Sequence, residues 1–122
     1  MILKEGDKLL VAHRRLFEGD ECRFFVGRVD AYENGVVKAT GRSFVRVVTG
    51  GRVIEKPEER TKILSLSSGT LMVYQLPESI PLEAVKFKAA DSRLWLTDGK
   101  DFTMDLAEAP RNGQVVKAAV GV

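Results

Sequence analysis

Apolar and polar residues alternate along most of this chain with a period of two, which is the pattern of strands that bury one face. The clearest stretch is Lys62–Leu76, where the alternation continues on both sides of Ser68-Gly69. Glycine at that point supplies the positive φ that a two-residue turn requires. We therefore predict a hairpin with one continuous apolar face, at the centre of a small β-barrel. Its facing pairs are expected to be Leu66 with Leu71 and Leu64 with Val73.

Further strands are predicted before this hairpin, over residues 9–14, 23–32, 36–48 and 52–56. Asn34-Gly35 is the strongest local signal, because this dipeptide favours the type I′ hairpin turn. Gly27 lies inside a predicted strand and indicates a bend, a bulge or close backbone packing, and Gly41 indicates a bend where the chain turns a barrel corner. The chain is expected to reverse at Thr49-Gly50-Gly51. Pro57 is expected to end the following arm, because proline cannot donate to a strand ladder.

Three short alternating segments follow the hairpin, at 85–89, 93–97 and 102–106, and predict an antiparallel meander. No amphipathic helix is indicated, apart from one possible helical turn over 81–85. We expect a single β-barrel domain over 1–106, with the added meander over 82–106 and a flexible or docked tail over 107–122.

The composition is that of a folded protein. The chain has 122 residues, 44% of them hydrophobic, which is enough for one core. A formal charge of +2 is only mildly basic and does not by itself indicate a nucleic-acid partner. The single cysteine, Cys22, excludes an intramolecular disulfide. Together with the absence of a signal sequence or a long apolar run, it predicts a cytoplasmic protein without a membrane partner.

Two segments resemble the motifs of the Sm-like (Lsm-like) family of small bent barrels. The first motif is matched by Gly27, Val29, Tyr32 and Glu33. The second is matched by Ser68-Gly69 and the apolar residues that follow. The resemblance covers about residues 23–76 and implies an all-β, partly open Sm-like or SH3-like barrel, to which a C-terminal antiparallel meander is added. The whole arrangement also resembles small bacterial proteins of unknown role.

In the Sm-like family an Asn and an Arg build the pocket that reads a uridine base, and here those positions hold Val37 and Ser68. Neither side chain can supply the hydrogen bonds that read a base edge. RNA or nucleotide binding is therefore not expected through the usual uridine pocket. The resemblance also implies oligomers that pair strand edges. Since the strand 70–76 lacks the charges that protect a free edge, we expect a homo-oligomer with Met72 and Tyr74 at or near the contact.

Candidate catalytic and metal-binding residues do not form a recognisable constellation. His13 is the only histidine, and the sequence identifies neither an orienting partner nor a nucleophile for it. Cys22 has no second cysteine with which to bind zinc. Asp98, Asp101 and Asp105 lack the spacing of a calcium loop and fit a hairpin turn. We expect a non-enzymatic binding or assembly module with no catalytic site, cofactor or metal.

The alternative is a nucleic-acid- or nucleotide-binding protein that uses a basic face. The residues expected to form that face are Arg14, Arg15, Arg42, Arg46 and Arg52. Arg42 and Arg46 also have the Arg-x-x-x-Arg spacing of PilZ barrels, which bind a cyclic dinucleotide. The Ser and the acid of that family's second motif are replaced here by Leu66 and Leu64, counting back from Gly69.

Overall fold

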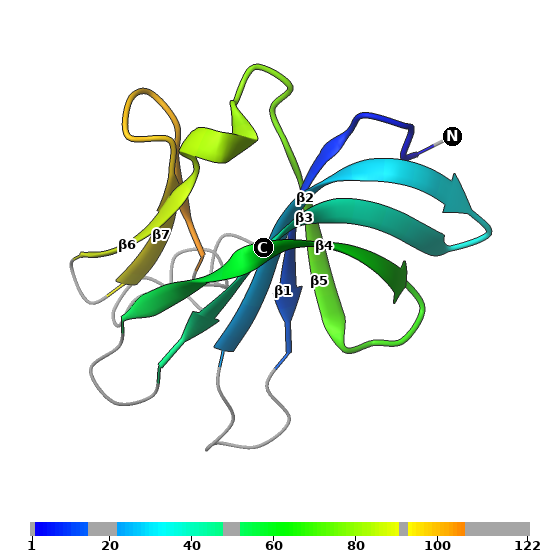
Figure 1. Cartoon of the computed structure of the whole chain (residues 1–122), viewed down its shortest axis with the longest axis horizontal. Coiled ribbons are helices and arrows are strands. Elements are labelled where there is room, and N and C mark those ends of the chain that lie inside the picture. Colours follow the sequence, from blue (N-terminus) through cyan, green and yellow to red (C-terminus); the bar gives the residue numbers. More distant parts are fainter. Residues whose placement is uncertain (1, 15–21, 48–51, 91–92, 107–122) are drawn as a thin grey trace, which may run out of the picture.

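The structure is a computed structural model that describes residues 2–14, 22–47, 52–90 and 93–106. Within these ranges the chain forms eight strands and one short 3₁₀ helix (Figure 1). They are β1 (Lys8–His13), β2 (Cys22–Glu33), β3 (Val36–Arg46), β4 (Val53–Ser65), β5 (Leu71–Leu76), η1 (Leu82–Ala84), β6 (Lys86–Ala90), β7 (Arg93–Thr97) and β8 (Thr103–Asp105). Arg15, the reversal at Thr49-Gly50-Gly51 and the tail 107–122 lie outside the described residues.

The strands form two antiparallel sheets, which confirms the all-β class. The first has the order β4-β3-β2-β1-β5, and the second has the order β6-β7-β8, which is the predicted meander. β4 and β5 are the two edges of the first sheet. The described strands therefore form an open five-stranded sheet and no closed barrel.

The ladder predicted between the two arms of the central hairpin is wrong. β4 pairs with β3, and β5 pairs with β1, so that the two arms lie at opposite edges of one sheet. The turn between them is present, with Gly69 at a φ of 77°. On one side of it the Leu66 N–H donates to the Gly35 carbonyl at 2.8 Å, and on the other the Arg14 N–H donates to the Thr70 carbonyl at 2.8 Å. Each arm thus continues its own ladder. The short loop between them connects the two edges of the sheet.

β4 also runs through Pro57, where the sequence predicted an end. The register between β3 and β4 shifts nearby: Arg42 lies opposite Glu59, whereas Phe44 lies opposite Glu55. The extra residues of β4 form a bulge on an edge strand, which is one of the few places where a strand tolerates proline. One strand of 13 residues consequently replaces the predicted arm and the first half of the hairpin.

Two apolar clusters lie on opposite faces of the five-stranded sheet. The inner face carries Leu9, Val11, Phe25, Val29, Val37, Ala39 and Leu64, with Leu66, Leu71 and Val73 partly buried against them. The four leucine and valine side chains of the predicted hairpin face therefore do share a core, although their strands do not pair. The outer face carries Leu10, Val26, Phe44 and Leu76, which pack with Ile80, Leu82, Val85 and Leu96.

The three-stranded sheet is attached to this outer face. Phe87 of β6 packs against Phe24 and Phe44, with ring centroids 4.9 and 4.7 Å apart. Leu96 of β7 is completely buried in the same cluster. The second sheet is thus held by a core that it shares with the first, and in Figure 1 it stands at the left.

The turn predicted at Asn34-Gly35 and the close backbone packing predicted at Gly27 are confirmed. Asn34 and Gly35 have φ values of 47° and 79°, as a type I′ turn requires. Gly27 and Gly41 lie directly opposite each other in the β2–β3 ladder. A Cβ atom on Gly41 would lie 2.0 Å from the carbonyl oxygen of Val26, so the two strands approach too closely for a side chain there.

Candidate functional site

The apolar inner face of the sheet becomes basic at one end, and a pocket of about 410 Å³ lies there. We call it the basic pocket. Its lining residues are His13, Arg23, Phe24, Ser43, Phe44, Val45, Lys56, Arg60 and Lys62. Five of these carry basic groups, and none is acidic. The residues come from four neighbouring strands, β1 to β4.

Strand alternation explains how these side chains reach one face. In β1 His13 continues the series of Leu9 and Val11, and in β2 Arg23 precedes Phe25 by two residues. The pairing of β1 with β2 places His13 directly opposite Arg23. Each strand therefore contributes apolar side chains to the core and one basic side chain to the rim of the same face.

β4 adds three basic residues in the same way. Arg60 and Lys62 precede the buried Leu64 at alternate positions, and Lys56 lies beyond the bulge. The Lys62 ammonium lies over the ring of Phe25, 5.0 Å from its centroid. This cation–π contact holds the ammonium at the boundary between the core and the pocket.

The cations in the pocket affect one another. Burial lowers the pKa of Lys62, and the neighbouring Arg60 and Arg23 cations lower it further. Burial also lowers the pKa of the His13 imidazole, with further contributions from Lys62 and Arg23. Each of these charges disfavours protonation of its neighbours, so a bound anion would relieve the repulsion.

Acidic groups offer these cations little compensation within the described part of the chain. Glu58 forms an ion pair with Arg60, with a distance of 3.5 Å between Oε2 and Nη2, and both side chains are largely exposed. Exposed pairs of this kind contribute little. His13, Arg23, Lys56 and Lys62 have no carboxylate within ion-pair distance among the described residues. The basic pocket therefore has an excess of positive charge.

Ser43 adds a polar group without a partner. Ser43 lies opposite Phe25 in the β2–β3 ladder, and its Oγ is buried without a hydrogen bond to any described residue. A buried hydroxyl without a partner costs about 1–3 kcal/mol. Because Oγ has no exposed surface, a ligand would reach it only after the side chains over it moved, and a ligand with acceptor oxygens would then supply that partner.

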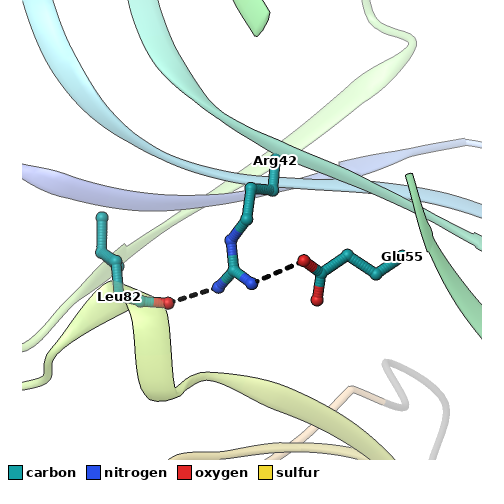
Figure 2. A network of polar contacts seen from close by, with 3 residues as sticks. All are labelled: Arg42, Glu55 and Leu82. Carbon is teal, nitrogen blue, oxygen red and sulfur yellow. Dashed lines mark hydrogen bonds and ion pairs between the residues drawn. The ribbon is translucent and has the colours of Figure 1, made fainter. Parts of the chain in front are cut away.

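The arginines expected from the sequence do not line this pocket. Arg42 faces the outer side, where its Nη1 donates to Glu55 Oε2 at 2.9 Å and its Nη2 donates to the Leu82 carbonyl at 2.5 Å (Figure 2). Its guanidinium carbon also lies 5.4 Å from the centroid of the Phe44 ring. Arg42 thus joins β3, β4 and η1, which is a structural role.

Of the other expected arginines, Arg46 and Arg52 lie at the same end of the β3–β4 ladder, where Arg46 is opposite Val53 and the Val47 N–H donates to the Arg52 carbonyl at 2.8 Å. Arg14 is exposed, and its Nη1 donates to the Gly69 carbonyl at 3.4 Å. Arg46 is half-buried and already interacts with another residue. Arg52 is exposed, and Arg15 lies outside the described residues. A basic face built from this set stays a prediction, and none of its described members lines the basic pocket.

The remaining expected site residues are placed as follows. Met72 of β5 is exposed, whereas Tyr74 is half-buried against the outer-face cluster. Val37, at the position of the uridine-pocket Asn, is completely buried, and Ser68 is exposed in the turn. The Asp98 carboxylate accepts hydrogen bonds from the backbone N–H groups of Lys100 and Phe102, which makes it a turn residue. Its contact with these two amides contributes to a lowered pKa of Asp98.

The described residues lack two features that define other classes of protein, a metal site and a membrane-spanning helix. No group of three His, Cys, Asp or Glu side chains in this part of the chain is close enough together to hold a metal ion. The same residues contain no helix of the length and apolar character that crossing a membrane would need.

A scan against protein-family models and searches of curated proteins and of solved structures gave no match to this chain. The geometry of the basic pocket is therefore the basis for the function proposed below.

The sequence did not reveal this pocket as a unit. The sites expected from the sequence do not include Arg23, Ser43, Lys56, Arg60 or Lys62, because closeness in the sequence does not show which side chains share a face. The available signal is alternation: a basic residue follows the apolar residues of the same face on β1 and precedes them on β2 and β4.

Proposed function

We propose that this protein is a non-enzymatic binding module whose basic pocket takes a compact, phosphate-bearing anion. The observation that supports this is the convergence of five basic side chains from three strands, β1, β2 and β4, on one pocket that no described acidic residue lines. A phosphate group has several acceptor oxygens and a charge of about −1.5 to −2 near pH 7, which suits such a set of donors.

The size of the pocket favours a small ligand. A volume of about 410 Å³ lies in the range of small-molecule sites. Phe24 and Phe44 also line it, but their rings pack against Phe87 in the outer-face cluster. Pyrophosphate, tripolyphosphate or a nucleotide has the charge and size that this pocket accommodates.

A binding role is favoured over a catalytic one by the state of Ser43. An enzyme that used this hydroxyl as a nucleophile would need a base in hydrogen-bond contact with it. His13 lines the same pocket, yet Ser43 Oγ has no hydrogen-bond partner. We therefore propose that the hydroxyl donates to a ligand and does not serve as a nucleophile.

Titration calorimetry with pyrophosphate tests this function. Lys62→Met removes the ammonium and keeps an apolar side chain over Phe25. We expect affinity to fall by about tenfold or more, the range for losing a hydrogen bond to a charged group. Lys38→Met is the matched control, since Lys38 is exposed on β3, opposite Ile63 in the adjacent strand. Equal losses in both variants, or no binding to the wild-type protein, would reject the proposal.

We further propose that the five-stranded sheet is an open relative of the Sm-like barrel. This is supported by the position of Gly27 at the close approach of β2 and β3, and by a bulge in β2 between Val29 and Ala31. The half-buried thiol of Cys22 is free, which fits a reducing, cytoplasmic setting. With Val37 in the core, a uridine pocket of the usual kind is not part of the proposal.

Assembly through a strand edge is a second proposal. Among the described strands β5 is an edge strand that pairs on one side only, and Met72 on it is 43% exposed. Since free edges recruit other chains, we expect a homo-oligomer in solution, with Met72 at or near the contact. Light scattering coupled to size exclusion measures the mass directly. Met72→Lys is expected to shift the population toward the monomer, and a wild-type mass of 13.5 kDa would contradict assembly.

A further inference from the structure

A second basic surface lies on the three-stranded sheet, remote in the sequence from the basic pocket. β6 presents Lys86 and Lys88 at alternate positions, and β7 presents Trp95 directly opposite Lys88. Residues of this face line a pocket of about 580 Å³ together with Lys100 from the β7–β8 turn. We call Lys86, Lys88, Trp95 and Lys100 the tryptophan platform. It is the face of the meander that turns away from Leu94 and Leu96, which are buried.

The platform is electropositive. No acidic residue of the described part of the chain lines its pocket. The carboxylate directly opposite Trp95, that of Asp105, forms an ion pair with Arg93. The Asp98 carboxylate, beside the turn, is bound by two backbone N–H groups. The charge of Asp98 also interacts with that of Lys100, and Asp101 follows Lys100 in the turn, so the lysines that remain to attract an anionic ligand are Lys86 and Lys88 of β6.

Trp95 is held as a rigid aromatic surface. Its Nε1 donates to the Ala90 carbonyl at 3.1 Å, which fixes the indole while leaving it only half-buried. The outer-face cluster already contains Phe87 on the opposite side of β6, so the core does not use this ring. A partly exposed, oriented indole among lysines is a stacking surface for a planar, negatively charged ligand.

From this juxtaposition we infer that the tryptophan platform binds single-stranded nucleic acid. One base stacks on the Trp95 indole, and the lysines contact the phosphates on either side of it. Lys86 and Lys88 are about 6.6 Å apart along β6, which is comparable to the step between phosphates of an extended strand. Stacking accepts every base, so we expect little base preference. This inference does not depend on the proposed function of the basic pocket.

Trp95 is the only tryptophan of the chain, so its fluorescence reports on the platform directly. A short single-stranded oligonucleotide is expected to quench this fluorescence in a saturable manner. Tripolyphosphate, which has charge and no bases, is expected to leave it unchanged. Equal quenching by both compounds would show that the platform is only an electrostatic surface, and no quenching by the oligonucleotide would also overturn the inference.

Binding of a fluorescein-labelled oligonucleotide, followed by anisotropy, separates the roles of the residues. Trp95→Ala is expected to weaken binding by about tenfold, and Trp95→Phe by much less, because the phenyl ring still stacks. Lys88→Ala should weaken binding and reduce its salt dependence by about one phosphate contact. Thermal melts show whether each variant is folded, and Lys88→Ala and Trp95→Phe keep the test valid if Trp95→Ala is not.

Two controls distinguish this site from the basic pocket. Lys38→Ala removes an exposed charge elsewhere and should leave oligonucleotide binding unchanged. Lys62→Met should also leave it unchanged, while Trp95→Ala should leave pyrophosphate binding unchanged. If Lys62→Met abolished oligonucleotide binding and Trp95→Ala did not, nucleic acid would belong to the basic pocket and the inference would be wrong.

Discussion

Ser43 connects the stability of the fold with the proposed binding of an anion. Its Oγ is buried without a hydrogen bond to any described residue, although the residue lines the basic pocket. Natural proteins often keep such unfavourable groups where a ligand satisfies them. The hydroxyl is thus expected to be unfavourable in the free protein and favourable in the complex.

Ser43→Ala should therefore raise stability and lower affinity at the same time. We expect the free energy of unfolding to increase by about 1–3 kcal/mol, because a buried polar group without a partner is removed. Urea denaturation measures the stability, and calorimetry with pyrophosphate measures the affinity. Thr97→Val is the control, since the Thr97 hydroxyl donates to the Phe102 carbonyl at 2.8 Å and its loss should destabilise. A destabilised Ser43→Ala would mean that Oγ has a partner after all.

His13 is the residue whose charge state reports on the pocket. Burial, Lys62 and Arg23 all lower its pKa in the folded protein. In the pH range between the folded and unfolded pKa values, the unfolded chain binds more protons than the folded one. Stability should therefore rise with pH through that range and fall as His13 becomes protonated. An anion in the pocket acts in the opposite direction, because it favours the imidazolium.

At the scale of the elements, the close approach of β2 and β3 determines the shape of the inner face. Gly27 and Gly41 lie opposite each other, and the ring of Phe25 lies beside them, 2.7 Å from where a Cβ of Gly27 would be. Any side chain at either position would push the strands apart. The β2–β3 contact thereby positions Phe25 and, through it, the Lys62 ammonium.

Gly41→Ala should be strongly destabilising. Its Cβ would lie 2.0 Å from the Val26 carbonyl oxygen and 2.4 Å from the Gly27 Cα, and backbone cannot move aside as a flexible side chain can. We expect a loss of about 3 kcal/mol or more, measured as a shift in the urea midpoint. Gly69→Ala is the comparison: that site is open, and only its φ of 77° opposes alanine, at a cost of about 1–2 kcal/mol. Similar losses in the two variants would contradict the close approach.

The elements also show which parts of the fold can be predicted from the sequence. Turns with strong local chemistry, such as Asn34-Gly35, were placed correctly because two residues determine their backbone. The end predicted at Pro57 is wrong because the effect of this proline depends on whether its own strand can form a bulge there, as β4 does. The sequence predicts that the strands of Leu64 and Leu71 pair with each other, because strands adjacent in the sequence usually form hairpins. In the structure they lie at opposite edges of the sheet, and the curvature of the whole sheet that allows this is not determined by any short segment.

At the scale of the whole molecule, the two sheets create two separate basic surfaces. One lies on the inner face of the five-stranded sheet, and the other lies on the exposed face of the meander. The outer-face cluster separates them, with Phe87 packed between the sheets. Counting charges along the chain gives a nearly neutral protein with a net charge of +2. Only the fold reveals how unevenly those charges are distributed, which is why the sequence did not predict the candidate site.

The central claim, that the basic pocket binds an anion, is tested most directly by NMR titration of His13. This is the only histidine of the chain, so its imidazole resonances can be assigned without ambiguity. In the free protein its pKa should lie below the ordinary value, and in Lys62→Met it should rise because one of the cations that lowers it is removed. With saturating pyrophosphate the pKa of His13 in the wild-type protein should rise, so that binding becomes tighter as the pH falls. A pKa of His13 that pyrophosphate leaves unchanged would contradict the account.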